Sequence, residues 1–201
     1  MLLRVPSSFR SRFRRTIPAQ CSAMAASRPR GPLRKKLDGF TGIRDGKNLP
    51  PPSKDKMARF ADLEDIAWRF TACRLSPEEW THRTHLAVGM WHVQRYGTAE
   101  ALAKLRTGIR SLNESHGTPN SATRGYHETI TRAYVQLLSA SYDACPSTMP
   151  LAERVTRLFD GPVAERDVLL RFYSRERLMS ADARAGWLEP DIPAAAGGED
   201  S

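Results

Sequence analysis

The chain has 201 residues, of which 40% are apolar and 26% charged, a composition typical of globular proteins and not of disordered or membrane proteins. Its longest apolar run, the six residues from Leu86 to Trp91, is far shorter than the roughly 18 residues that a membrane-spanning helix needs, so no membrane insertion is expected. The net charge of +9 is unevenly distributed along the chain. Residues 1–56 carry fourteen Lys and Arg against three Asp and Glu, a net of +11, and residues 57–201 carry −2. No nucleic-acid partner is therefore expected for the folded part.

The first 37 residues are rich in Arg and Ser and contain no acidic residue. This composition is typical of an organelle transit peptide, and the high Arg content favours the mitochondrion over a plastid. We therefore expect residues 1–37 to engage an organelle import machinery. Residues 38–56, with three consecutive prolines, are expected to be a linker. The alternative is that translation starts at Met57, which would make the protein cytoplasmic.

From residue 57 onward, apolar residues recur every three or four positions, the period of amphipathic helices, and no stretch alternates with a period of two. Ser76 suits an N-cap, Pro77 a first helical position, and Glu79 completes a capping box. Gly97 is expected to end that helix. The predicted helices are 58–73, 77–96, 98–116, 126–144, 151–159 and 163–173, with a last short one at 180–187.

These elements predict an all-α fold. We expect a single compact domain of about six helices over residues 57–188, after a disordered basic leader. The residues that follow, 189–201, are rich in Pro, Ala and Gly and are expected to be a disordered tail.

All five histidines lie within 46 residues of the chain. On a helical projection of residues 77–96, His82, His85 and His92 share one face, and the other faces are mostly apolar. A helix that is apolar on most sides is buried. Its imidazoles then need polar partners, because each unpaired buried polar group costs about 1–3 kcal/mol.

Metal coordination would supply such partners. His82 and His85 are three residues apart and can point into one site, and His127 on a later helix is the candidate third ligand. Neutral imidazole binds divalent transition metals such as Zn or Fe, and three protein nitrogens with an open position describe a catalytic site. The alternative is that these histidines form hydrogen bonds within the helical core. His92 and His116 are interpreted as structural.

Candidate catalytic groups and substrate contacts lie around this set. Glu128 and Tyr134 follow His127 on the same predicted helix and are candidate acid or base groups. Candidate contacts to an anionic substrate are Arg124, Arg175 and Arg177, because a guanidinium binds carboxylates and phosphates. The alternative for Arg124 is a surface ion-pair ladder with Glu128 and Arg132, and for Arg177 a position on the surface.

Residues 75–187 resemble a group of small bacterial-type helical proteins of unknown function. The segments that carry the resemblance are WTHRTHLAVGMW, LNESHG, GYHETITR and YSRERLMS. The resemblance implies that the core can exist without the leader. It implies no substrate and no cofactor.

Two functions are compatible with these features. The first is a small metalloenzyme that acts on a small molecule, with one metal on the three histidines and a bound water or dioxygen as the reactive group. The second is a metal-free helical binding module whose histidines and arginines line a pocket for an acidic ligand or a partner peptide.

Overall fold

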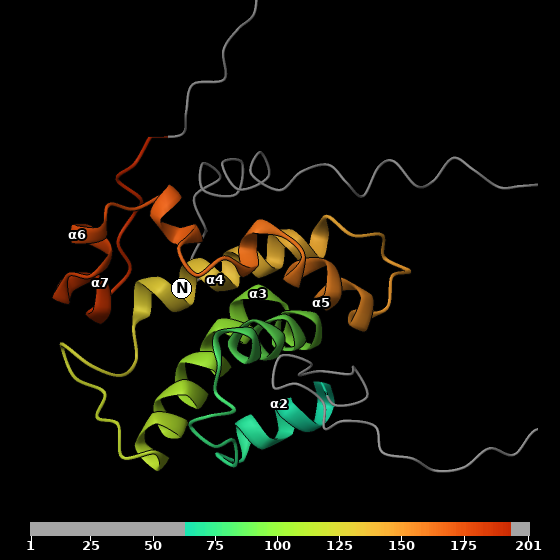
Figure 1. The fold of residues 1–201 in the computed structure, drawn as a ribbon, viewed down its shortest axis with the longest axis horizontal. Coiled ribbons are helices and arrows are strands. Elements are labelled where there is room, and N and C mark those ends of the chain that lie inside the picture. The colour runs from blue at the N-terminus through green and yellow to red at the C-terminus, as the bar shows by residue number, and fades with distance from the viewer. Residues whose placement is uncertain (1–62, 194–201) are drawn as a thin grey trace, which may run out of the picture.

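A computed structural model describes residues 63–193, and these are all-α, with no strand among them (Figure 1). The expected leader (1–37), the linker (38–56) and the tail beyond residue 193 lie outside the described residues. No helix in the described part is both long and apolar enough to cross a membrane. The helices are α2 (Leu63–Thr71), α3 (His82–Ser115), α4 (Glu128–Asp143), α5 (Leu151–Phe159), α6 (Arg175–Leu178) and α7 (Ala181–Ala185), with 3₁₀ turns η2 (Pro162–Ala164) and η3 (Val168–Arg171).

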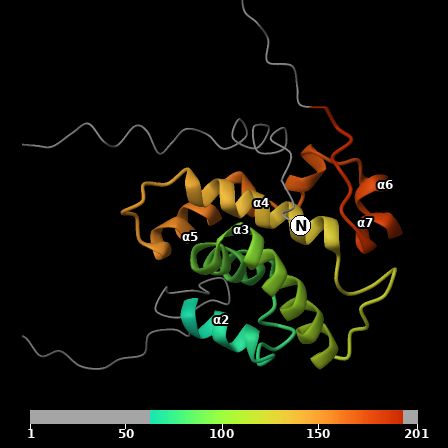
Figure 2. The same cartoon turned by 180° about the vertical axis from the view of Figure 1, so that it is seen from behind.

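Helix α3 lies at the centre of this fold. It packs against α2 on one side and α4 on the other, and the two opposite views agree on this order (Figures 1 and 2). Helix α2 buries Leu63, Ile66 and Phe70, the stripe that the sequence predicts for it. The α3–α4 pair brings together His82 at the start of α3 and the middle of α4, which is where the site described below is found.

Gly97 divides α3 into two helical segments. Its backbone has φ 72° and ψ 170°, and the helix resumes directly after it. A Cβ at this position would meet nothing within 4 Å, so the left-handed φ, and not crowding, requires the glycine. The break predicted at this residue is confirmed. Thr98, the first residue beyond it, hydrogen-bonds Ser139 of α4 at 2.7 Å.

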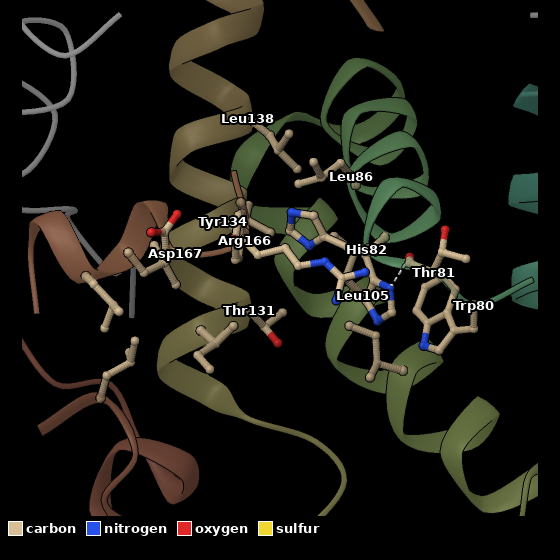
Figure 3. A pocket seen from close by; sticks show the side chains of 18 of the residues that line it. Trp80, Thr81, His82, Leu86, Leu105, Thr131, Tyr134, Leu138, Arg166 and Asp167 are labelled. Carbon is tan, nitrogen blue, oxygen red and sulfur yellow. Dashed lines mark hydrogen bonds between the residues drawn. The ribbon is translucent and has the colours of Figure 1, made fainter. Parts of the chain in front are cut away.

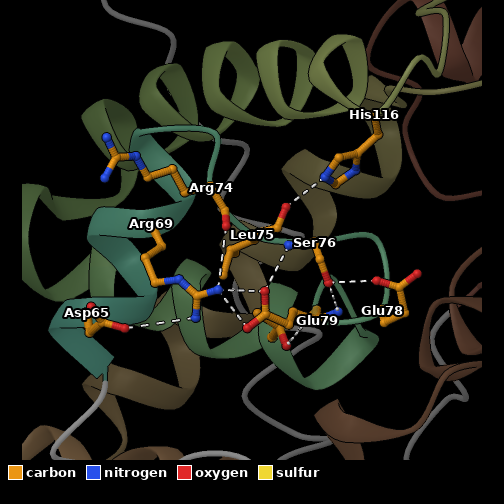
Figure 4. Close-up of polar contacts among 9 residues, drawn as sticks. Asp65, Arg69, Arg74, Leu75, Ser76, Glu78, Glu79 and His116 are labelled. Carbon is orange, nitrogen blue, oxygen red and sulfur yellow. Dashed lines mark hydrogen bonds and ion pairs between the residues drawn. The ribbon is translucent and has the colours of Figure 1, made fainter.

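The predicted start of this helix at Pro77 is wrong, because α3 begins at His82. The capping-box contacts do form: the Ser76 N–H donates to Glu79 at 2.9 Å, and the Glu79 N–H donates to the Ser76 hydroxyl at 3.4 Å (Figure 4). They close only a single turn. Thr81 is the N-cap of α3, since its hydroxyl accepts the Thr84 N–H at 3.3 Å. The Thr84 hydroxyl donates to the Glu79 carbonyl of the preceding turn at 2.6 Å.

The predicted helix at 163–173 is also wrong, because the chain forms η2 and η3 instead. Val163 and Val168 are both buried but five residues apart, about 140° apart on an α-helix, so one straight helix could not bury both on one face. Two short turns bury them both. The segment after α7 also contacts this region: the Ile192 N–H donates to the Phe172 carbonyl at 3.0 Å, and Asp191 accepts two hydrogen bonds from Ser174.

Candidate functional site

A pocket of about 720 Å³ lies between α3, α4 and the segment 166–179 (Figure 3). Most of its wall is apolar, including Leu86, Leu105, Ile109, Leu138 and Leu178. Its polar groups are few and come from separate elements. They are Trp80 and Thr81 before α3, His82 and His85 of α3, Thr131 and Tyr134 of α4, and Arg166, Asp167 and Arg175 of the later segment.

Helix α3 places three of the lining residues on one face. His82, His85 and Gly89 follow one another at helical spacing, so all three face α4. A Cβ at Gly89 would lie 2.5 Å from Leu138 Cδ1. The glycine therefore allows the Leu138 side chain of α4 to pack directly on α3, which sets the wall of the pocket beyond the histidines.

His82 has a buried ring nitrogen that is not used by the fold. Among the described residues, Nε2 of His82 has no hydrogen-bond partner. Burial lowers the pKa of His82 below its ordinary value; a backbone hydrogen bond at Ala164 opposes this, and the positive charge of Arg166 adds to it. The imidazole is therefore neutral near pH 7.

Tyr134 provides a second unpartnered polar atom in the same pocket. Its hydroxyl is buried and has no partner within residues 63–193. Its ring lies edge-on to the His82 ring, with centroids 5.6 Å apart. Burial raises the pKa of Tyr134 to about 12, with a further contribution from the negative charge of Asp167. The hydroxyl therefore stays protonated and is available as a donor.

His85 is held in place by its neighbours. Its Nδ1 donates to the Thr81 carbonyl at 2.7 Å, which leaves Nε2 without a proton. Its ring stacks on Trp80, with centroids 3.7 Å apart. Burial lowers the pKa of His85 to about 4, so this ring is also neutral near pH 7.

Two arginines reach the pocket without being paired by the fold. Neither Arg166 nor Arg175 forms a side-chain hydrogen bond or ion pair in the described range 63–193. Arg166 extends across the pocket toward His82 (Figure 3). Arg175 was predicted as a substrate contact, and it does line the pocket. Arg166 and Asp167 also line the pocket and were not among the predicted site residues; they lie between η2 and η3, where a single helix was predicted.

His127 does not join the other two predicted metal ligands. It is the N-cap of α4: its Nδ1 accepts the Ile130 N–H at 3.3 Å. Its Nε2 therefore carries the proton and donates to the Leu178 carbonyl at 2.9 Å. Both ring nitrogens are thus used by the fold. Among the described residues, no group of three His, Cys, Asp or Glu side chains is arranged to hold a metal, so the set of His82, His85 and His127 is not assembled.

Glu128 is held away from the pocket by a buried polar network. Both of its carboxylate oxygens accept from Arg106 of α3, and one also accepts from the Tyr126 hydroxyl at 2.8 Å. Burial alone would raise the pKa of Glu128, but these hydrogen bonds outweigh it and the pKa lies below its ordinary value. Glu128 therefore ties α4 to α3 as a carboxylate, and it does not line the pocket where an acid or base role was predicted.

The other two predicted substrate contacts lie outside the pocket. Arg124 is exposed in the loop before α4, and Glu128 pairs with Arg106 and not with the predicted ladder. Arg177 donates from Nε to the Glu189 carbonyl at 2.8 Å. It fixes the segment after α7 and does not line the pocket.

His92 and His116 have structural positions, as expected. Nδ1 of His92 donates to the Val88 carbonyl at 2.8 Å inside the core. His116 is the C-cap of α3, and its Nε2 hydrogen-bonds the Leu75 carbonyl at 2.7 Å (Figure 4). Neither lines the pocket.

No protein-family model, curated protein or solved structure matches this chain. The resemblance to small helical proteins therefore stands on its four sequence segments alone. Three of these segments contribute residues to the pocket: the first supplies His82, the third Thr131 and the fourth Arg175.

Proposed function

We propose that this protein binds a small, mostly apolar molecule with an acidic group in the pocket between α3 and α4. The observation that carries the proposal is the pair of buried, unpartnered polar atoms in the pocket, His82 Nε2 and the Tyr134 hydroxyl. Leaving such an atom unpaired costs about 1–3 kcal/mol. A ligand that pairs with both would remove that cost.

The apolar lining of the pocket is the reason to expect a mostly apolar ligand. Aliphatic side chains from both long helices, from η3 and from α6 make the lining mostly apolar, and burial of apolar ligand area against them stabilises a complex by about 25 cal/mol per Å². A volume of about 720 Å³ is within the usual range of small-molecule pockets. A few polar groups in a mainly apolar cavity fix orientation and give specificity.

The two arginines of the lining are the reason to expect an acidic group on the ligand. Arg166 and Arg175 line the pocket without an ion-pair partner in the described part of the chain. A guanidinium presents several donors in a plane that matches a carboxylate or a phosphate. Asp167 is the one acidic residue of the lining, so the arginine charge exceeds the acidic charge there.

A metal-dependent enzyme is the second candidate. The observation in its favour is that His82 Nε2 is unpartnered and lies close to His85 on the same helix face. A mononuclear catalytic site usually has three protein ligands, and His127 uses both ring nitrogens elsewhere. The residues present therefore fit a three-histidine metal site poorly. The binding module has more support.

Calorimetric titration of the full chain tests the proposal. The probes are octanoate and 4-phenylbutanoate, each compared with the alcohol of the same carbon skeleton. We expect each acid to bind about tenfold or more tightly than its alcohol, because one charge-assisted pair contributes about 1.5–3 kcal/mol. Arg166→Gln should weaken binding of the acids but not of the alcohols. Arg124→Gln is the matched control and should change neither.

Two results would overturn the proposal. One is that neither acid binds at millimolar concentration. The other is that purified chain contains about one transition metal ion per molecule, and that His82→Ala removes it. The second result would establish the metal-dependent candidate instead.

A further inference from the structure

We propose that His82, Tyr134 and Arg166 together hold the acidic group of the ligand, and that the site takes up one proton when this group binds. The inference rests on the proposed function, and it names the subsite and its chemistry. The unpartnered Nε2 of His82 is its starting point.

The three residues converge on one region of the pocket from three different elements. His82 is in the first turn of α3, Tyr134 is in the middle of α4, and Arg166 lies between η2 and η3. The His82 and Tyr134 rings are in edge contact, with centroids 5.6 Å apart. Arg166 is close enough for its charge to act on His82, and Figure 3 shows its side chain extended toward that ring. One carboxylate could therefore contact all three.

The donors and acceptors of these residues determine the proton count. The Tyr134 hydroxyl and the Arg166 guanidinium are donors, and each can donate to a carboxylate oxygen. Neutral His82 carries one ring proton. The backbone hydrogen bond at Ala164 raises the pKa of His82, so a ring N–H donates there, and because Nε2 has no partner this N–H is on Nδ1. Nε2 therefore has a lone pair and is an acceptor. Two acceptors repel at hydrogen-bond distance. A proton from solvent must therefore lie between Nε2 and the ligand oxygen, as an N–H···O or an N···H–O hydrogen bond. No other bond is formed or broken.

Burial of His82, with a smaller contribution from the charges around it, explains why this proton is absent before binding. His85, one turn further along α3, is neutral near pH 7 because burial lowers its pKa to about 4. Arg166 is positive and opposes a second positive charge on His82. Arg175 adds positive charge to the lining, and Asp167 is the one opposing acidic group. A bound carboxylate compensates the Arg166 charge and gives the new proton an acceptor.

Binding should therefore depend on pH in one direction. Above the pKa of His82 in the free protein and below its pKa in the complex, the complex holds one more proton than the free species. In that window the Kd of an acid rises about tenfold per pH unit, by linkage. An alcohol of the same skeleton carries no charge to compensate, so its Kd should be independent of pH.

The test is calorimetric titration of the full chain with octanoate at pH 7 in phosphate, HEPES and Tris. These buffers differ in ionisation enthalpy, so the slope of the observed heat against that enthalpy counts the protons taken up. We expect about 0.5–1 proton for octanoate and none for octan-1-ol. His82→Gln should still bind octanoate but take up no proton. Tyr134→Phe should bind it more weakly and still take up a proton. His116→Gln, outside the pocket, should behave as the wild type.

The outcomes separate this inference from the proposed function. If octanoate binds with no proton uptake, the inference is wrong and the proposed function stands. If His82→Gln binds with proton uptake undiminished, the proton is on another group and the inference is wrong. If neither octanoate nor 4-phenylbutanoate binds, the proposed function fails and the inference with it.

Discussion

The ring of Tyr134 on α4 lies edge-on to the ring of His82 on α3, with centroids 5.6 Å apart, and a buried polar atom of each has no partner in the described part of the chain. Two such atoms side by side in a stable fold are unusual, because buried polar groups are nearly always paired. Gln136 is the other residue of the described part with buried unpartnered side-chain atoms, and it does not line the pocket. His82 and Tyr134 therefore mark the place in the pocket where a ligand can supply missing partners.

Tyr134→Phe should therefore leave the ligand-free protein as stable as the wild type, or more stable by about 1 kcal/mol, because it removes a buried unpaired hydroxyl. The matched control is Tyr173→Phe. The Tyr173 hydroxyl donates to the Leu188 carbonyl at 3.0 Å, so its loss should destabilise the fold by about 1 kcal/mol. Urea unfolding measures both. Equal destabilisation by the two substitutions would show that the Tyr134 hydroxyl is paired in solution.

His127→Ala should lower the free energy of unfolding by about 1–3 kcal/mol, because it removes the N-cap of α4 and leaves the Leu178 carbonyl unpaired. His127→Asn should recover part of the loss, because asparagine is also a good N-cap. Neither change should alter the metal content of the purified chain. Loss of a bound metal in both variants would restore His127 as a ligand.

The stability of the fold should fall as the pH is lowered from 7 to 5. The pKa values of His82, His85, His92 and His127 all lie below the ordinary value of 6.5, chiefly because of burial. The unfolded chain then binds more protons than the folded chain between the two pKa values, so protonation favours unfolding. For His85 this window extends from 6.5 down to about 4.

Thermal unfolding at a series of pH values measures this effect. His85→Gln should flatten the dependence between pH 6.5 and pH 4, because it removes the group with the widest window. His116→Gln is the matched control, since it leaves these four histidines in place. A melting temperature that is constant from pH 7 to pH 5 would contradict the burial of these histidines as neutral rings.

Sequence patterns predicted the helix ends correctly where a single capping or breaking residue marks the end. Helix α5 begins and ends at the predicted residues, 151 and 159, and Gly97 breaks α3 where expected. The start of α3 could not be predicted, because Ser76 and Thr81 are both good N-caps and both cap a turn. The Thr84 hydroxyl also donates to the Glu79 carbonyl at this junction, a contact that no sequence pattern predicts.

The site was predicted in part for a similar reason. The helical projection correctly placed His82 and His85 on one face, and that face lines the pocket. Which residues lie opposite that face depends on tertiary packing, and a helical projection does not predict it. His127 had the right residue type for a third ligand, but its two ring nitrogens are used by Ile130 and Leu178. Arg166 lines the pocket from between the two short turns that form in place of the predicted helix.

Residues 1–37 fused to a reporter protein should direct it to the mitochondrion, because an Arg-rich segment without acidic residues is driven across a membrane by its potential. Fluorescence microscopy with a mitochondrial marker measures this. The control replaces four of the arginines by glutamate and should leave the reporter in the cytoplasm. A cytoplasmic location for the unchanged fusion would instead favour translation from Met57.

Two-dimensional NMR of the isotope-labelled full chain with octanoate shows whether the acid binds between α3 and α4. If the acid binds in the α3–α4 pocket, the amides of Gly89, Thr131 and Leu178 should shift in a saturable way, with those of Gly117 and Ser121 unchanged, because only the first three residues line the pocket. Arg166→Gln should weaken the binding that these shifts report by about tenfold. Saturable shifts confined to residues outside the pocket, or none at all, would show that this pocket does not bind the acid.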